Sequence, residues 1–122
     1  MLLKYPTPGL LSAGPMAGAF FENMVVTEIL KRKLNRQRTY DMYFIRDSQG
    51  TEVDILLDFG HRMLMVEIKL NKTPRRDHAK NIATFQSELP GTPGIVLNLA
   101  ENEVAWSKSI RAVHWSMFLR TL

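Results

Sequence analysis

The sequence predicts one α/β domain with the element order αβββαβ, in which helices flank a mixed central sheet. Three observations support this prediction. Apolar residues recur at helical spacing after residue 17, three alternating segments separated by short turns occupy residues 39 to 70, and a second helical stripe precedes a buried strand near residue 94. With 122 residues and 45% hydrophobic content, the chain has the size of one domain that buries about two thirds of its unfolded surface.

Residues 1–16 are expected to form an arm or the remnant of a linker, so the domain itself spans residues 17–122. This segment contains three prolines and two glycines and shows no sustained period. We then expect a helix from about Ala17 to Leu34, whose first half is apolar nearly all round and is therefore expected to be buried. The apolar residues at helical spacing are Phe20, Met24, Val25, Ile29 and Leu30.

Three strands are expected next, over residues 39–46, 51–58 and 62–70, with turns at residues 47–50 and 59–61. Such short turns predict an antiparallel meander. In the third strand, Leu64, Val66, Ile68 and Leu70 face one way and Met63, Met65, Glu67 and Lys69 face the other. In the second strand, Val53, Ile55 and Leu57 oppose Glu52, Asp54, Leu56 and Asp58.

The second half of the chain is predicted to add a helix and further strands. After Pro74, one helical stripe contains His78, Ile82, Phe85 and Leu89, and the sequence PGTPG ends that helix. The apolar segment 94–100 is a buried strand, and weaker strand signals follow in ENEVAW and IRAVHW. Ser116 is expected to cap a short terminal helix through Leu119.

Composition narrows the classes of function. The chain contains no cysteine, which excludes thiolate catalysis and cysteine-ligated metals and fits a reducing cytoplasm. No apolar run approaches the roughly 20 residues that span a membrane. The glycines of GLLSAGPM lack the Lys-Ser/Thr of a Walker A loop, so this segment provides no ATPase site, and the three histidines show no zinc spacing. The net charge of +4 and the pI near 9.6 favour polyanionic partners.

The chemistry is expected to lie in the predicted hairpin. Folding back at Gly60 brings Asp54 near Glu67, with Lys69 on the same strand face as Glu67. Two close carboxylates repel unless they are protonated or bridged by a cation, and such oxygen ligands suit Mg²⁺ or Mn²⁺. A divalent ion beside a lysine favours phosphodiester hydrolysis. The alternative is a solvated strand face whose charges pair across the sheet.

The phrases GAFFENMVVTEIL, YFIRDSQGTEVDILL and VEIKL carry a resemblance to known families. With the αβββαβ order they resemble the PD-(D/E)XK nuclease superfamily, which implies a restriction-endonuclease-like fold. More narrowly, residues 17–122 resemble a domain of unknown function at the C-terminal side of prokaryotic AAA-type P-loop ATPases. Val53 stands where the superfamily motif has proline. This resemblance implies that Asp54 and Glu67 bind metal and that Lys69 is catalytic.

The resemblance also implies an acid on the first helix, and Glu22 matches that position. Independently, Glu22 falls on an otherwise apolar sector of the helix, where an acid needs a partner. The alternatives are that Glu22 only favours the helix dipole, or that Glu28 is the helical acid of the site.

Contacts with nucleic acid are predicted from basic residues that follow the site. Lys72, Arg75, Arg76 and Lys80 could track a phosphate backbone, as could the run of residues 31–38, although a solvated helix end also explains such runs. Gln86 of the second helix is a further candidate, with an exposed structural glutamine as its alternative. The predicted function is Mg²⁺-dependent DNA hydrolysis by a domain attached to an N-terminal ATPase domain outside this chain. The alternatives are a catalytically inactive module that binds DNA or protein, and an oligomerisation domain.

Overall fold

The computed structural model describes residues 14–35 and 40–122, and it has the predicted mixed α/β architecture. The elements follow one another as α2 (Ala17–Asn35), β1 (Asp41–Arg46), β2 (Glu52–Asp58), β3 (Met63–Ile68), the 3₁₀ helix η1 (Arg76–Ala79), α3 (Lys80–Glu88), β4 (Gly94–Asn98), β5 (Val104–Ala105), β6 (Ile110–His114) and α4 (Trp115–Thr121). The αβββαβ order is therefore confirmed, with β5, β6 and α4 added after it.

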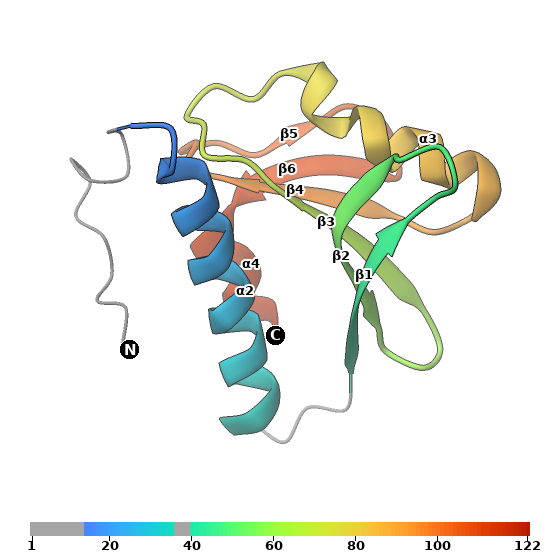
Figure 1. Ribbon diagram of the computed structural model, residues 1–122, viewed down its shortest axis with the longest axis horizontal. Helices are drawn as coiled ribbons and strands as arrows, with labels where there is room; N and C mark the ends of the chain where they lie inside the picture. Colours follow the sequence, from blue (N-terminus) through green and yellow to red (C-terminus); the bar gives the residue numbers. More distant parts are fainter. Residues whose placement is uncertain (1–13, 36–39) are drawn as a thin grey trace.

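The six strands form one sheet in the order β1-β2-β3-β4-β6-β5 (Figure 1). The first three strands are an antiparallel meander, as the short turns predict, whereas β3, β4 and β6 run parallel. A parallel pair needs a crossover, and the segment containing η1 and α3 provides it between β3 and β4. The strand β3 is thus the boundary between the antiparallel and the parallel halves of the sheet.

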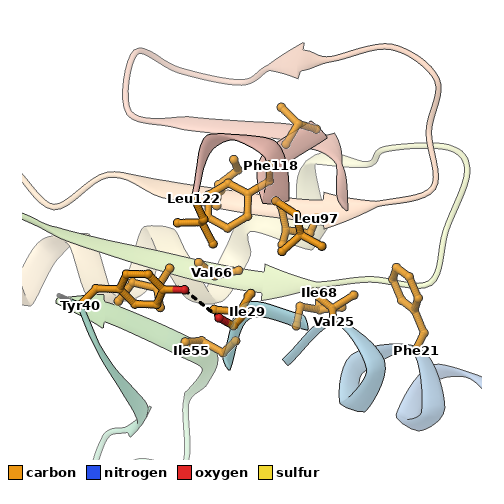
Figure 2. Close-up of a cluster of buried hydrophobic side chains, with 14 residues drawn as sticks. Phe21, Val25, Ile29, Tyr40, Ile55, Val66, Ile68, Leu97, Phe118 and Leu122 are labelled. Atoms are coloured by element: carbon orange, nitrogen blue, oxygen red, sulfur yellow. Dashed lines mark hydrogen bonds between the residues drawn. The ribbon is translucent and has the colours of Figure 1, made fainter. Parts of the chain in front are cut away.

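Helices cover both faces of the sheet, and each face has its own core. The helices α2 and α4 pack on one face, where Phe21, Val25 and Ile29 of α2 are fully buried (Figure 2). The Tyr40 hydroxyl donates a 2.7 Å hydrogen bond to the Ile29 carbonyl and so ties the start of β1 to this helix. On the other face, η1 and α3 bury Ala79, Ile82 and Phe85 against the sheet.

Several details differ from the sequence-based expectation. Val53 was expected to share a face with Ile55, yet it packs in the α3-side core while Ile55 packs in the α2-side core. The cap of α4 is His114, whose side chain accepts a hydrogen bond from the Ser116 amide, so the prediction of Ser116 as the cap was wrong. The predicted faces of β3 are confirmed, since Val66 and Met65 belong to opposite cores.

The outer face of α2 is not buried, contrary to the expectation for its first half. Four exposed apolar residues, one just before the helix and three within it, lie on one side of it, opposite the buried stripe. They are Met16, Phe20, Leu30 and Leu34, with exposed fractions of 60%, 44%, 45% and 68%. Of the predicted arm, residues 1–13 lie outside the described residues. Among the helices that are described, none is long and apolar enough to cross a membrane.

Candidate functional site

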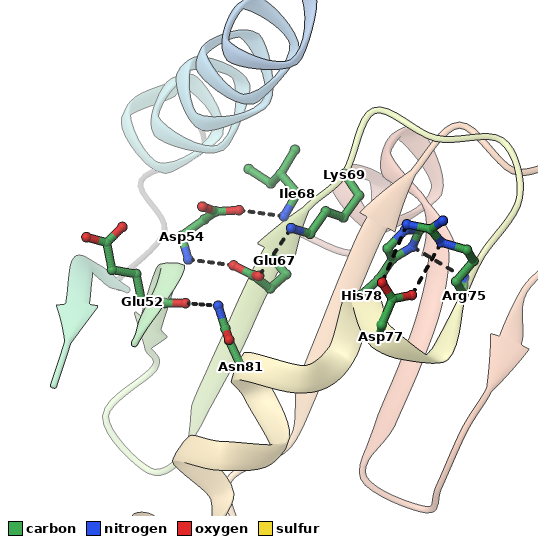
Figure 3. A network of polar contacts seen from close by, with 9 residues as sticks. All are labelled: Glu52, Asp54, Glu67, Ile68, Lys69, Arg75, Asp77, His78 and Asn81. Carbon is green, nitrogen blue, oxygen red and sulfur yellow. Dashed lines mark hydrogen bonds and ion pairs between the residues drawn. The ribbon is translucent and has the colours of Figure 1, made fainter. Parts of the chain in front are cut away.

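The candidate site lies where β2 and β3 separate. Their backbone pairing ends at Ile55 and Val66, and two carboxylates replace the next rungs of the ladder (Figure 3). The Asp54 amide donates to Glu67 Oε1 at 3.0 Å, and the Ile68 amide donates to Asp54 Oδ2 at 2.7 Å. Each acid therefore accepts a backbone hydrogen bond from the other strand, which fixes both carboxylates at the fork.

A β-bulge sets the direction of Asp54. Tyr43 pairs with Leu56 and Ile45 pairs with Val53, so Asp54 and Ile55 of β2 together lie opposite a single residue of β1. An extra residue on one strand breaks the alternation of faces and turns the neighbouring side chains. This bulge explains why Val53 and Ile55 enter different cores. A sequence pattern with period two could not locate it.

Lys69 completes the group at the carboxyl end of β3. Its Nζ lies 3.8 Å from Glu67 Oε2, and its side chain is 41% exposed while that of Glu67 is 5% exposed. The lysine can therefore move toward solvent or toward a bound molecule, whereas the glutamate is held inside. Open α/β sheets bind ligands outside the carboxyl ends of their strands, which is where Lys69 lies.

Glu22 reaches the same site from α2. Together with Asp54 it lines a hollow of about 230 Å³ between the helix and the β1–β2 hairpin. Glu28 instead pairs with Lys31 at 3.5 Å. The structure thus places Glu22, and not Glu28, beside Asp54. Four residues from three elements come together here, and we call Glu22, Asp54, Glu67 and Lys69 the four-residue cluster.

Burial, together with neighbouring charges, raises the pKa of two carboxyl groups in the four-residue cluster. Burial, reinforced by the charge of Asp54, raises the pKa of Glu67 from 4.5 to about 7, although the Asp54 amide and Lys69 oppose the shift. Burial also raises the pKa of Glu22, and the charge of Asp54 and a hydrogen bond with its side chain act in the same direction. Carboxyl groups with raised pKa values beside a charge partner are characteristic of functional sites.

The carboxylates of the four-residue cluster suit a divalent ion that keeps several waters better than an ion whose ligands all come from the protein. Within residues 14–35 and 40–122, no three acidic or histidine side chains are grouped closely enough to hold a metal ion. Mg²⁺, however, commonly binds through one or two carboxylates and retains several waters. Asp54 and Glu67 supply such a pair. Burial is the main cause of the raised pKa of Glu67, and the charge of Asp54, which adds to the shift, is one that a cation would offset.

The predicted nucleic-acid contacts fall into two groups. Lys72, Arg75, Arg76 and Lys80 are all exposed on the segment that follows the site, and Arg75 pairs with Asp77 at 3.3 Å (Figure 3). Gln86 is not near the four-residue cluster. Its amide donates to the Thr92 carbonyl at 3.0 Å and to Ser109 Oγ at 3.1 Å, which joins α3 to the amino ends of β4 and β6.

Two neighbours of the site were not predicted from the sequence. Asn81 of α3 donates its side-chain amide to the Glu52 carbonyl at 2.9 Å and so anchors the start of β2 (Figure 3). Phe44 of β1 lines the same hollow as Glu22 and Asp54. Its position opposite the bulge depends on strand register, although an exposed aromatic residue in an edge strand is a signal that pattern analysis can find.

A larger hollow, of about 420 Å³, lies at the other end of the sheet. Phe59, Arg62, Ile95, Lys108 and Phe118 are among its lining residues, and none of the four-residue cluster is. Its walls are aliphatic, aromatic, basic and hydroxyl-bearing, without a carboxylate side chain. This hollow is larger than the one beside Asp54, but its lining lacks the carboxylate and lysine arrangement of the β2–β3 fork.

Fold and site together define a class: a mixed α/β domain with a carboxylate and lysine cluster where an antiparallel hairpin meets a parallel sheet. The model of the family described as a domain of unknown function, DUF4143, matches residues 17–118. This match covers most of the chain, so the protein belongs to the DUF4143 family. Among curated proteins, none matches the chain.

Proposed function

We propose that this domain is a metal-dependent phosphodiesterase that hydrolyses DNA, as a nuclease of the PD-(D/E)XK type. The observation that carries the proposal is the convergence of Asp54, Glu67 and Lys69 at the fork. The αβββαβ order and the resemblance to that superfamily add support. In this proposal the domain is attached to an AAA-type ATPase and acts in the cytoplasm.

Each residue of the four-residue cluster has a distinct proposed role. Asp54 and Glu67 would hold a Mg²⁺ or Mn²⁺ ion, which would supply Lewis-acid polarisation of the phosphate and of the attacking water. Lys69, which is partly exposed, places a positive charge where negative charge develops on the phosphate. Glu22, whose pKa is raised by burial, accepts or returns a proton on the α2 side of the hollow.

Basic residues next to the site fit a polyanionic substrate. Lys72, Arg76 and Lys80 are exposed along the loop, η1 and the start of α3. Phosphate neutralisation by such side chains makes binding strongly dependent on salt. The proposed path of DNA therefore runs from the fork over η1, and it does not reach Gln86.

The test is cleavage of supercoiled plasmid DNA with Mg²⁺ or Mn²⁺. Asp54→Asn keeps an oxygen that can accept the Ile68 amide but removes the charge, so it should retain the fold and lose cleavage. Lys69→Ala should lower the rate by roughly 10² to 10³. Asp41→Ala and Lys108→Ala, which remove exposed charges outside the cluster, should cleave like the wild type. Equal cleavage by the wild type and by Asp54→Asn would overturn the proposal.

A second candidate function is a non-catalytic module that docks onto the attached ATPase domain. The exposed apolar residues on the outer face of α2 favour this candidate, because contiguous exposed apolar patches commonly mark binding surfaces. The measurement is co-elution of this domain with the separately produced ATPase domain. Leu30→Glu with Leu34→Glu should abolish co-elution and leave the fold intact. Failure of the unmodified domains to associate would contradict this candidate.

A further inference from the structure

The hollow beside Asp54 has an aromatic wall in addition to its acids. Phe44 lines it together with Glu22, and the phenylalanine side chain is 77% exposed. It lies on β1, at the edge of the sheet and opposite the bulge that displaces Asp54. A large apolar ring is therefore exposed to water next to three carboxylates, those of Glu22, Glu52 and Asp54.

The direction of the Phe44 side chain follows from its neighbours in β1. Met42 packs against the α2-side core and Ile45 packs against the α3-side core. Side chains alternate along a strand, so Phe44 lies on the α2 face and Tyr43 lies on the other. Glu22 extends from α2 over that same face, which agrees with the shared lining of the hollow.

The remaining walls limit what can enter the hollow. Its volume of about 230 Å³ is below the roughly 300–1,000 Å³ of sites for drug-sized ligands, so it suits a single planar ring. Arg46 also lines the hollow and pairs with Glu52 at 3.3 Å, with both side chains exposed. An exposed ion pair of this kind contributes little free energy, so Arg46 can leave Glu52 and bind a phosphate.

We propose that Phe44 stacks on an unpaired base of the substrate and thereby places the adjacent phosphate at the four-residue cluster. This inference rests on the proposed hydrolysis of DNA and specifies its substrate as single-stranded DNA or a frayed or overhanging end. Every base offers a π face to an aromatic ring, so the contact is independent of sequence. In an intact duplex both faces of each internal base are already stacked, and Phe44 has no base to contact.

The experiment measures binding and cleavage in parallel with the same protein preparations of the full chain. The probes are an oligothymidylate with one 2-aminopurine, a blunt duplex, and that duplex with a single-stranded overhang. Binding is measured by 2-aminopurine fluorescence and by anisotropy in the presence of Ca²⁺, which prefers oxygen ligands. Cleavage is measured on gels in the presence of Mn²⁺. The variants are Phe44→Ala, Phe44→Trp and, as a matched control from the same strand, Tyr43→Ala.

The expected result is quenching of 2-aminopurine by the wild type, with cleavage of the single strand and the overhang and not of the blunt duplex. Phe44→Ala should weaken single-strand binding roughly tenfold or more, the loss of one stacked base. Phe44→Trp should retain binding, and Tyr43→Ala should behave like the wild type. Because Phe44 is exposed, its replacement should leave the thermal unfolding curve unchanged.

The outcomes separate this inference from the proposed function. Unchanged binding and cleavage in Phe44→Ala, or no binding of single strands by the wild type, overturns the stacking role. Equal cleavage of the blunt duplex and of the overhang also overturns the stacking role, but it leaves the proposed hydrolysis of DNA supported. Binding that depends on Phe44 without cleavage by any sample supports stacking and overturns hydrolysis instead.

Discussion

Replacing Glu67 with glutamine should make the protein more stable at neutral and alkaline pH. Burial beside Asp54 raises the pKa of Glu67 from 4.5 to about 7. In the folded protein this carboxyl group therefore binds its proton more tightly than in the unfolded chain. The resulting stability is present at low pH, declines as the pH rises from about 4.5 to 7, and stays low above that range. A glutamine is neutral throughout and avoids this loss.

The magnitude follows from the size of the shift. The difference between 4.5 and about 7, at 1.36 kcal/mol per pH unit, corresponds to about 3 kcal/mol in the free energy of unfolding. The glutamine oxygen can still accept the hydrogen bond from the Asp54 amide, so the fork is retained. For a domain of this size, a gain of that order raises the melting temperature by roughly 10 °C at pH 8. At pH 5 the two proteins should differ little.

The assay is thermal unfolding, followed by circular dichroism, of the wild type and Glu67→Gln between pH 5 and pH 8. Glu103→Gln is the control, because Glu103 is an exposed acid paired with Arg111 at 3.0 Å, and exposed pairs contribute little. A Glu67→Gln variant that is less stable than the wild type at pH 8 would refute the reasoning. Such a result would mean that the charge of Glu67 stabilises the fold.

Two further predictions concern the scaffold of the site. Tyr40→Phe removes the buried hydrogen bond to the Ile29 carbonyl and should lower the free energy of unfolding by about 1 kcal/mol in urea titrations; an unchanged midpoint would contradict it. Gly94→Ala places a methyl group against the Ile82 side chain and should cost about 1–3 kcal/mol in the same assay. Gly18→Ala, where the space is open, is the matched control and should be neutral or stabilising. An equal decrease in the free energy of unfolding in both alanine variants would exclude overpacking at Gly94.

Much of the fold could be predicted because the chain follows simple periodicities. Val25 and Ile29 of the predicted helical stripe and the alternation around Val66 require no knowledge of tertiary contacts, whereas the burial of Phe21 was not predicted. The exposure of the outer face of α2 could not be predicted in this way. Its apolar residues have the same spacing as buried ones, and only the packing of the sheet decides which side of the helix is covered.

The candidate site was predictable where it depends on local geometry. Asp54 and Glu67 meet because a hairpin with a short turn fixes their register. The bulge at Asp54 and the position of Phe44 escaped prediction, since an irregularity in pairing is a property of two strands together. The choice between Glu22 and Glu28 likewise required knowledge of how α2 lies on the sheet.

We propose that Asp54 and Glu67 form a site for a divalent cation, and this proposal is tested by calorimetric titration with Mn²⁺. At pH 7, the wild type should bind one ion and release roughly half a proton, because Glu67, with a pKa of about 7, must lose its proton to become a ligand. Proton release is measured by repeating the titration in buffers that differ in ionisation enthalpy. Asp54→Asn should abolish binding. Absence of binding by the wild type at millimolar Mn²⁺, or equal binding by Asp54→Asn, would contradict the claim.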